Sequence, residues 1–93
     1  MAQGYIMKED GTTVEVDVRQ ETLNSDNVYC VVDEDSRSVY LWLGSSAGVR
    51  KRFVGARTAQ KIRAQHGLHF RVHSLDEGSE DQNFLNSLQN ETT

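Results

Sequence analysis

Residues 28–44, VYCVVDEDSRSVYLWLG, contain two apolar runs that are separated by a short polar connection. The first run is almost continuously apolar, which is typical of a strand at the centre of its sheet. The second run follows after so few residues that the two predict an antiparallel hairpin of core strands. Cys30 lies inside the first run, where we expect a packed and unreactive thiol.

The residues before this hairpin predict two more strands. Residues 5–7 form a short apolar piece, and the Glu9-Asp10-Gly11 sequence that follows is typical of a hairpin turn. In residues 13–18, valines alternate with polar residues, which is the period of a strand buried on one face. Residues 24–27, NSDN, then predict a turn before the core hairpin.

The residues after the hairpin predict two helices and one strand. A long helix is expected from about Gly48 to His66, with Gly67 as its C-terminal cap. Residues 70–75 alternate like a strand, and residues 79–82, SEDQ, resemble a capping box before a short amphipathic helix. The prediction is one α+β domain over residues 1–93, ordered from about 4 to 89, with a polar tail at 90–93.

Composition and charge limit the class of protein. The chain has 93 residues, 37% of them hydrophobic and 26% charged, with no proline, which fits one ordinary globular domain. It contains no apolar run long enough for a membrane span and no signal-peptide pattern, so we expect a cytoplasmic protein. The net charge is −4, yet six of the ten basic residues fall between Arg50 and Arg63. The sequence therefore predicts an acidic molecule with one basic face.

Patterns typical of enzymes and metal sites are missing from the sequence. LGSSAG, at residues 43–48, lacks the Gly and Lys spacing of a phosphate-binding loop, and no nucleophile with a partnered base is recognisable. His66, His69 and His73 are not joined by other ligand types at zinc-binding intervals. We expect no enzymatic activity and no cofactor.

Two segments carry a resemblance to a known family. The run VEVDVRQETLNSDNVYCVVDEDSRSVYLWLG, residues 14–44, resembles gelsolin and villin domains, which have a Val-Glu-Val strand, a Leu-Asn-Ser-Asn-Asp turn, a hairpin and a Trp-x-Gly before a long helix. LDEGSEDQNF, residues 75–84, resembles the family's Glu-Gly-x-Glu followed by Phe. The resemblance implies a five-stranded mixed sheet between one long and one short α-helix. It also implies actin binding, usually under calcium control, with the long helix in a cleft between two actin subdomains.

Calcium binding is where this sequence departs from the family pattern. The resemblance implies a site made by the Asn-Asp turn and by a Glu in the first turn of the long helix. Here the turn is Asp26-Asn27 and the helix position is Lys51. Calcium needs several hard, partly anionic oxygen ligands. We therefore expect a degenerate calcium site at Asp26, Asn27 and Lys51, with Asp26 as a weak remaining metal candidate. The family's second, actin-bridging calcium uses an Asp where this chain has Arg63.

Two interpretations of Lys51 remain open. In the first, its ammonium takes the place of the cation, pairs with Asp26 and the turn carbonyls, and makes the domain calcium-independent. In the second, Lys51 extends into solvent and the site is merely lost.

The long helix carries two stripes that a single sheet cannot both bury. At about 100° per residue, one side consists mostly of small residues, and the resemblance places it against the sheet: Lys51, Gly55, Thr58, Ala59 and Ile62. The other side carries larger apolar residues beside three aligned cations: Val49, Phe53, Ala56 and Gln60, with Arg50, Arg57 and Lys61. If the small residues face the sheet, Phe53 is an exposed aromatic with an arginine rim, as in an interface hot spot. In the alternative, Phe53 and Val49 are core residues.

The first functional hypothesis is an actin-binding module without calcium control, associated with the cytoskeleton, that docks its long helix on actin. The residues expected to make this contact are Val49, Arg50, Phe53, Arg57 and Lys61. The alternative is an adaptor domain that keeps the fold for other protein contacts, or one that binds phosphoinositide headgroups through the basic stripe. Nucleic acid is not expected, because the stripe lacks interleaved aromatic residues. The sequence does not distinguish capping, severing, sequestering and nucleation.

Overall fold

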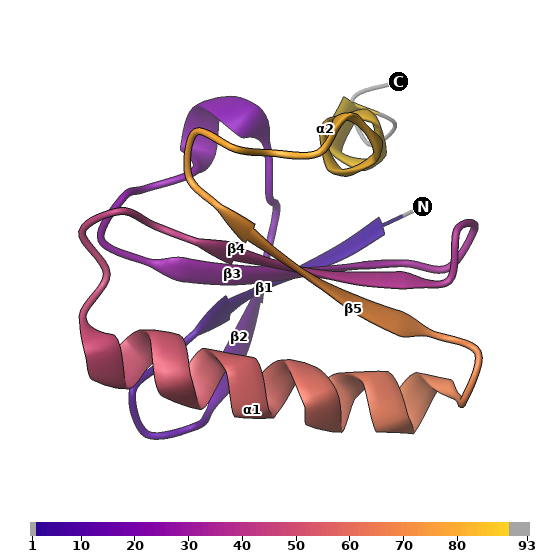
Figure 1. The fold of residues 1–93 in the computed structure, drawn as a ribbon, viewed down its shortest axis with the longest axis horizontal. Helices are drawn as coiled ribbons and strands as arrows, with labels where there is room; N and C mark the ends of the chain where they lie inside the picture. The colour runs from indigo at the N-terminus through magenta and orange to yellow at the C-terminus, as the bar shows by residue number, and fades with distance from the viewer. Residues whose placement is uncertain (1, 90–93) are drawn as a thin grey trace.

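A single mixed β-sheet lies between two layers of helix in the computed structural model, which describes residues 2–89 (Figure 1). The sheet order is β2-β1-β3-β4-β5, formed by β1 (Ala2–Met7), β2 (Thr13–Val16), β3 (Val28–Asp33), β4 (Ser38–Leu43) and β5 (Arg71–Asp76). The first four strands pair antiparallel, and β5 pairs in parallel with β4. The predicted core hairpin of β3 and β4 is confirmed.

The two helices cover opposite faces of this sheet. The long helix α1 (Val49–His66) connects β4 to β5 across one face, because a parallel pair of strands needs a long crossover. The short helix α2 (Gln82–Gln89) lies on the other face, on the same side as the 3-10 turn η1 (Gln20–Thr22) (Figure 1). The predicted α+β fold, with five strands between one long and one short helix, is confirmed. Neither α1 nor α2 is long and apolar enough to cross a membrane.

Two hydrophobic clusters form the core, one on each face of the sheet. The cluster under α1 contains alternate residues of β3 and β4 together with the helix residue Ala59: Val28, Cys30, Val32, Val39 and Leu41. The cluster under α2 contains the intervening residues and two helix residues: Tyr29, Val31, Tyr40, Trp42, Phe84 and Leu88. Burial of both faces explains why β3 and β4 are continuously apolar in sequence. Desolvation raises the pKa of Cys30 to about 12, so this thiol stays protonated and unreactive at neutral pH, as predicted.

Two local predictions are wrong. The alternating valines do not form one strand buried on a face, since β2 ends at Val16 and Val14 is 44% exposed on this edge strand, whereas Val18 is buried beyond the strand end. The capping box at residues 79–82 does not form either. Instead the Asp81 carboxylate accepts a hydrogen bond from the Asn83 N–H at 2.8 Å and caps α2. The polar tail predicted at residues 90–93 lies outside the described residues.

Candidate functional site

The side of α1 that faces the sheet buries two of the smallest residues of the helix. Gly55 and Ala59 are buried, while Lys51, Thr58 and Ile62 are half-buried. A Cβ atom placed on Gly55 would lie 2.9 Å from Cγ1 of Val28, which is closer than real Cβ atoms approach their neighbours. The absence of a side chain at Gly55 therefore allows the helix backbone to approach β3 closely. This orientation of α1 is the one that the family resemblance implied.

The opposite side of α1 exposes its two large apolar residues at the helix start. Val49 is 84% exposed and Phe53 is 62% exposed. The Arg57 guanidinium lies over the Phe53 ring, with Cζ at 5.9 Å from the ring centroid, which is cation–π geometry. The alternative interpretation, in which Phe53 and Val49 are core residues, is wrong. Close packing of the small residues on the sheet directs the large ones outward.

The basic residues of α1 fall into two groups. In one group the fold itself uses the charge: Arg52 Nη2 lies 3.3 Å from the Asp76 carboxylate, and Arg63 Nε donates to the Phe70 carbonyl at 2.7 Å. In the other group are the three exposed cations of the outward stripe, Arg50, Arg57 and Lys61. Within residues 2–89 their side chains make no hydrogen bond or ion pair, and the Arg57 guanidinium lies over the Phe53 ring.

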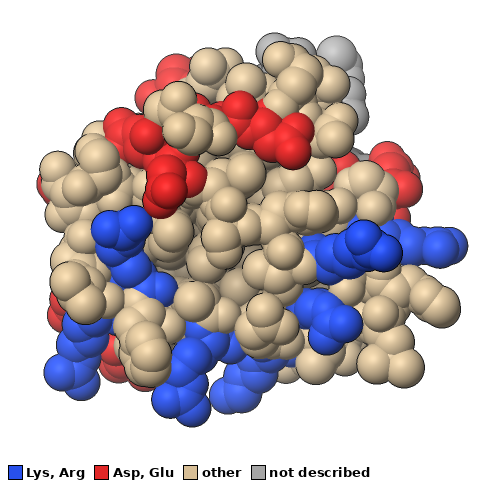
Figure 2. Space-filling model, in the orientation of Figure 1, with Lys and Arg blue, Asp and Glu red and all other residues tan. Residues whose placement is uncertain are grey.

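The surface charge is separated accordingly. Figure 2 shows lysines and arginines along the lower edge of the molecule, where α1 lies, and also on its right-hand side, while most acidic residues in this view lie in its upper part. The predicted basic face is therefore present. It follows the uncovered side of α1.

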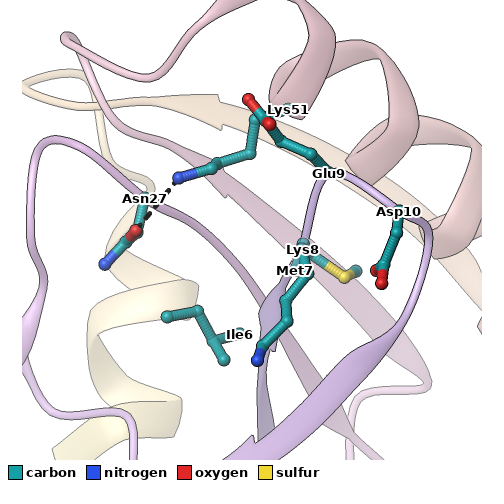
Figure 3. A pocket seen from close by; sticks show the side chains of 7 residues that line it. All are labelled: Ile6, Met7, Lys8, Glu9, Asp10, Asn27 and Lys51. Atoms are coloured by element: carbon teal, nitrogen blue, oxygen red, sulfur yellow. Dashed lines mark hydrogen bonds between the residues drawn. The ribbon is translucent and has the colours of Figure 1, made fainter.

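Lys51 points away from this basic stripe, towards the turn that precedes β3 (Figure 3). Its ammonium donates to the Asp26 carbonyl at 3.1 Å and to Oδ1 of Asn27 at 3.3 Å. The interpretation in which Lys51 extends into solvent is therefore wrong. The expected pairing with Asp26 needs correction in one detail, because the contact is to its main-chain oxygen and no ion pair with its carboxylate is present among the described residues.

Beside Lys51 the surface is hollowed. A cavity of about 580 Å³ is lined by residues from β1, the β1–β2 turn and this site: Ile6, Met7, Lys8, Glu9, Asp10, Asn27 and Lys51 (Figure 3). Within residues 2–89, no group of three or more His, Cys, Asp or Glu side chains is placed to hold a metal ion.

Glu77 also holds the turn that precedes β3, a role that was not predicted from the sequence. Its carboxylate accepts hydrogen bonds from the Ser45 N–H at 2.8 Å and from the Ser25 hydroxyl at 2.7 Å. These hydrogen bonds lower the pKa of Glu77, with the Ser45 backbone contributing most. The signal was available, because Glu77 follows the strand parallel to β4 and must lie beside the turn that follows β4.

Gly44 completes this arrangement. Its N–H donates to the Asn27 carbonyl at 3.1 Å, and a Cβ atom on Gly44 would lie 2.2 Å from the Ser25 carbonyl oxygen. Because the obstructing atoms are backbone, they cannot move aside as a flexible side chain does. The glycine of the Trp-x-Gly sequence is therefore required by the turn on which Lys51 rests.

Two known structures resemble this chain over nearly its whole length. No protein-family model matches the chain, and no curated protein matches its sequence significantly. Thorarchaeota ProGel, crystallised in complex with rabbit actin, is 30% identical, with a TM-score of 0.88 over 95% of this chain and 99% of that chain. Thorarchaeota 2DGel3, also crystallised with rabbit actin, is 26% identical with a TM-score of 0.76 over 92% of this chain, which spans 44% of 2DGel3.

A third similar structure extends the fold beyond these proteins. The human COPII-coat protein Sec24c is 12% identical, with a TM-score of 0.63 over 94% of this chain and 15% of Sec24c. At this level of identity the likeness concerns the fold alone.

Proposed function

The chain belongs to the gelsolin-like domains, and from this premise we propose that it is an actin-binding module of the gelsolin and villin family that docks α1 on actin. The observation that carries the proposal is Phe53, which is 62% exposed under Arg57 on the side of α1 that the sheet leaves uncovered. The proposal is supported by the 30% identity to ProGel, a protein crystallised with rabbit actin, over nearly the full length of both chains.

The outward side of α1 has the chemistry that such a contact needs. Phe53 and Val49 supply apolar area, and its removal from water by a partner favours binding. Arginine and aromatic residues are the types that dominate binding energy at interfaces. The unpaired cations Arg50, Arg57 and Lys61 around them attract an acidic partner surface and raise the association rate. No reacting group is needed, so the proposed activity is binding, through which the domain regulates filament assembly by holding monomers or capping ends.

The test is the affinity for actin of Phe53→Asp beside a matched control, Leu68→Asp. Leu68 is 86% exposed and follows the far end of α1, so this control also replaces an exposed apolar side chain by Asp, but away from the outward stripe. We expect wild type to alter pyrene-actin polymerisation. Loss of a hot-spot aromatic predicts that Phe53→Asp binds about 100-fold more weakly while its melting temperature is unchanged. Leu68→Asp should bind like wild type. Wild-type affinity in Phe53→Asp contradicts the proposal.

We also propose that actin binding is independent of calcium. The proposal is supported by the Lys51 ammonium, which lies on Asp26 O and Asn27 Oδ1 and brings a positive charge to oxygens that a cation would otherwise use. A second positive ion at this place would be repelled. Affinity for actin should be the same in calcium and in chelator. Micromolar calcium binding at this turn by isothermal titration calorimetry contradicts the proposal.

A second candidate function is binding of anionic phosphoinositide headgroups. It is favoured by the same three cations, Arg50, Arg57 and Lys61, whose charges have no counter-ion among the described residues. Two assays distinguish this function from actin binding. A lipid-binding domain sediments with phosphoinositide-containing vesicles, whereas an adaptor or lipid-binding domain leaves pyrene-actin polymerisation unchanged.

A further inference from the structure

A groove runs along α1 on the side of the β1–β2 turn. One wall is the helix and the other is the turn, with a volume of about 470 Å³ lined by Gly11, Val54, Arg57, Thr58, Gln60 and Lys61. Gly11 adopts a φ of +89°, and a Cβ atom there would lie 3.9 Å from Cγ1 of Val54. The turn therefore closely approaches the helix at one end of the groove.

The groove is positively charged and has no counter-ion of its own. Arg57 and Lys61 line it, and neither forms an ion pair within residues 2–89. The nearby carboxylate of Asp10 is already engaged in its own turn, where it accepts hydrogen bonds from the Thr12 N–H at 3.0 Å and the Thr12 hydroxyl at 2.6 Å. These two hydrogen bonds lower the pKa of Asp10, so it stays ionised. It forms no ion pair with Arg57 or Lys61 within residues 2–89.

The remaining lining residues make the groove partly apolar. Val54 is half-buried, and the Thr58 hydroxyl donates to the Val54 carbonyl at 2.8 Å, so its hydrogen is not available to a ligand. A ligand that fits both parts carries a carboxylate next to an apolar group. An acidic protein segment has this chemistry.

The groove is continuous with the outward stripe of α1. Arg57 belongs to both, because it lines the groove and lies over the Phe53 ring. A partner that covers Phe53 must therefore also lie beside the mouth of the groove. A recess beside a helix is filled by a protruding side chain better than by the flat surface of a lipid bilayer, and this favours a protein as the occupant.

We propose that this groove is a second part of the actin-docking surface, in which Lys61 and Arg57 receive an acidic side chain of actin that lies beside an apolar one. This inference rests on the proposed function of the outward stripe. It adds a specific contact, which should slow dissociation, to the general attraction that the basic stripe exerts.

The test compares three charge reversals that change the net charge equally. Lys61→Glu alters the groove, Arg50→Glu alters the stripe outside the groove, and Arg71→Glu alters an exposed cation on β5 as the control. Association and dissociation rates with monomeric actin are measured by biolayer interferometry. We expect Lys61→Glu to weaken affinity about tenfold, mainly through faster dissociation, because it breaks a desolvated charge contact. Arg50→Glu should mainly slow association, and Arg71→Glu should leave both rates within about twofold of wild type.

The outcomes separate this inference from the proposed function. If Lys61→Glu behaves like Arg71→Glu while Phe53→Asp abolishes binding, the groove is not part of the interface and the proposed function stands. If Lys61→Glu and Arg50→Glu both change only the association rate, the groove contact is also excluded. If wild type does not bind actin but sediments with phosphatidylserine vesicles in a Lys61-dependent manner, the groove binds a lipid and both proposals fail.

Discussion

The two faces of α1 carry different kinds of apolar residue for different purposes. On the inward face, Gly55 and Ala59 are buried because their small size lets the helix lie close to β3. On the outward face, Val49 and Phe53 are the exposed residues, although they are the more apolar ones. Apolarity alone therefore does not identify the buried face of this helix. The shape of the helix surface and the closeness of its packing determine which face is buried.

The cations of α1 show the same division. Lys51 and Arg52 contact groups of the domain itself, whereas Arg50 and Lys61 make no such contact within residues 2–89. A charge that the fold engages should affect the free energy of unfolding. A charge that the fold leaves unpaired should affect binding and leave the stability nearly unchanged. The following substitutions test this distinction, beginning with the largest expected effect.

The largest effect is expected from Gly55→Leu on the inward face. Because a Cβ atom at Gly55 already lies 2.9 Å from Val28 Cγ1, a leucine must displace the helix from the sheet. Overpacking of this kind destabilises a protein by about 3 kcal/mol or more when the whole contact has to separate. The matched control is Ala56→Leu on the exposed side, which should change the free energy of unfolding by less than about 0.5 kcal/mol. Urea denaturation measures both, and equal stability of the two variants contradicts the assigned orientation of α1.

A smaller effect is expected from Lys51→Met, with Arg50→Met as its neighbour on the other face. Lys51→Met keeps most of the aliphatic stem and removes the hydrogen bonds to Asp26 O and Asn27 Oδ1. Loss of these contacts should cost about 1 kcal/mol, because hydrogen bonds from charged donors are worth more than neutral ones but this ammonium is partly exposed to solvent. Arg50→Met should be neutral or slightly stabilising, because it removes a cation from the positive end of the helix dipole. Thermal denaturation at low salt measures the difference in stability. If Lys51→Met is as stable as wild type, the contact does not support the turn.

Much of the fold could be predicted from the sequence because the core strands have unambiguous patterns. The continuous apolar runs of β3 and β4 predicted the central hairpin, and the long helix with Gly67 after it was placed correctly. The limits of β2 could not be predicted in the same way. Its valines alternate, but an edge strand need not bury its alternating residues, and the burial of Val18 depends on the lack of a side chain at Gly4 in the neighbouring strand.

Less of the candidate site could be predicted. Helix periodicity defined the two stripes, and the family resemblance implied which of them faces the sheet. The resulting exposure of Phe53 and inward direction of Lys51 are confirmed, while a role of Phe53 in actin binding stays a prediction. The contacts of Glu77 and Glu80 join segments that are far apart in the chain, so local patterns do not predict these partners. For Glu77 the signal lies in the topology, because this residue follows the strand parallel to β4. The groove beside α1 depends on how the β1–β2 turn packs on the helix. Such packing cannot be obtained from spacing alone.

Glu80 extends the comparison to an acidic residue that the fold engages. Its carboxylate accepts a hydrogen bond from Trp42 Nε1 at 2.9 Å, which lowers the pKa of Glu80 from its ordinary value of 4.5. A lowered folded-state pKa stabilises the protein above the unfolded value, and this contribution is lost as the pH falls through the folded-state pKa. We expect stability to decline below pH 4.5 more steeply in wild type than in Glu80→Gln. Chemical denaturation between pH 7 and pH 3 measures this, and parallel curves would falsify it.

The smallest effect is expected where an engaged cation remains accessible to water. Arg52 and Asp76 lie 3.3 Å apart, but their side chains are 43% and 69% exposed, so solvent screens their attraction. A double-mutant cycle with Arg52→Met and Asp76→Asn should give a coupling free energy of about 0.5 kcal/mol or less at low salt. The coupling should vanish in 1 M salt, where the screening length is only about 3 Å. A coupling that persists at high salt contradicts the expectation and places Arg52 with Lys51, among the charges on which the fold depends. If the coupling vanishes, the contribution of Arg52 to stability lies between that of the engaged Lys51 and that of the unpaired cations on the outward face.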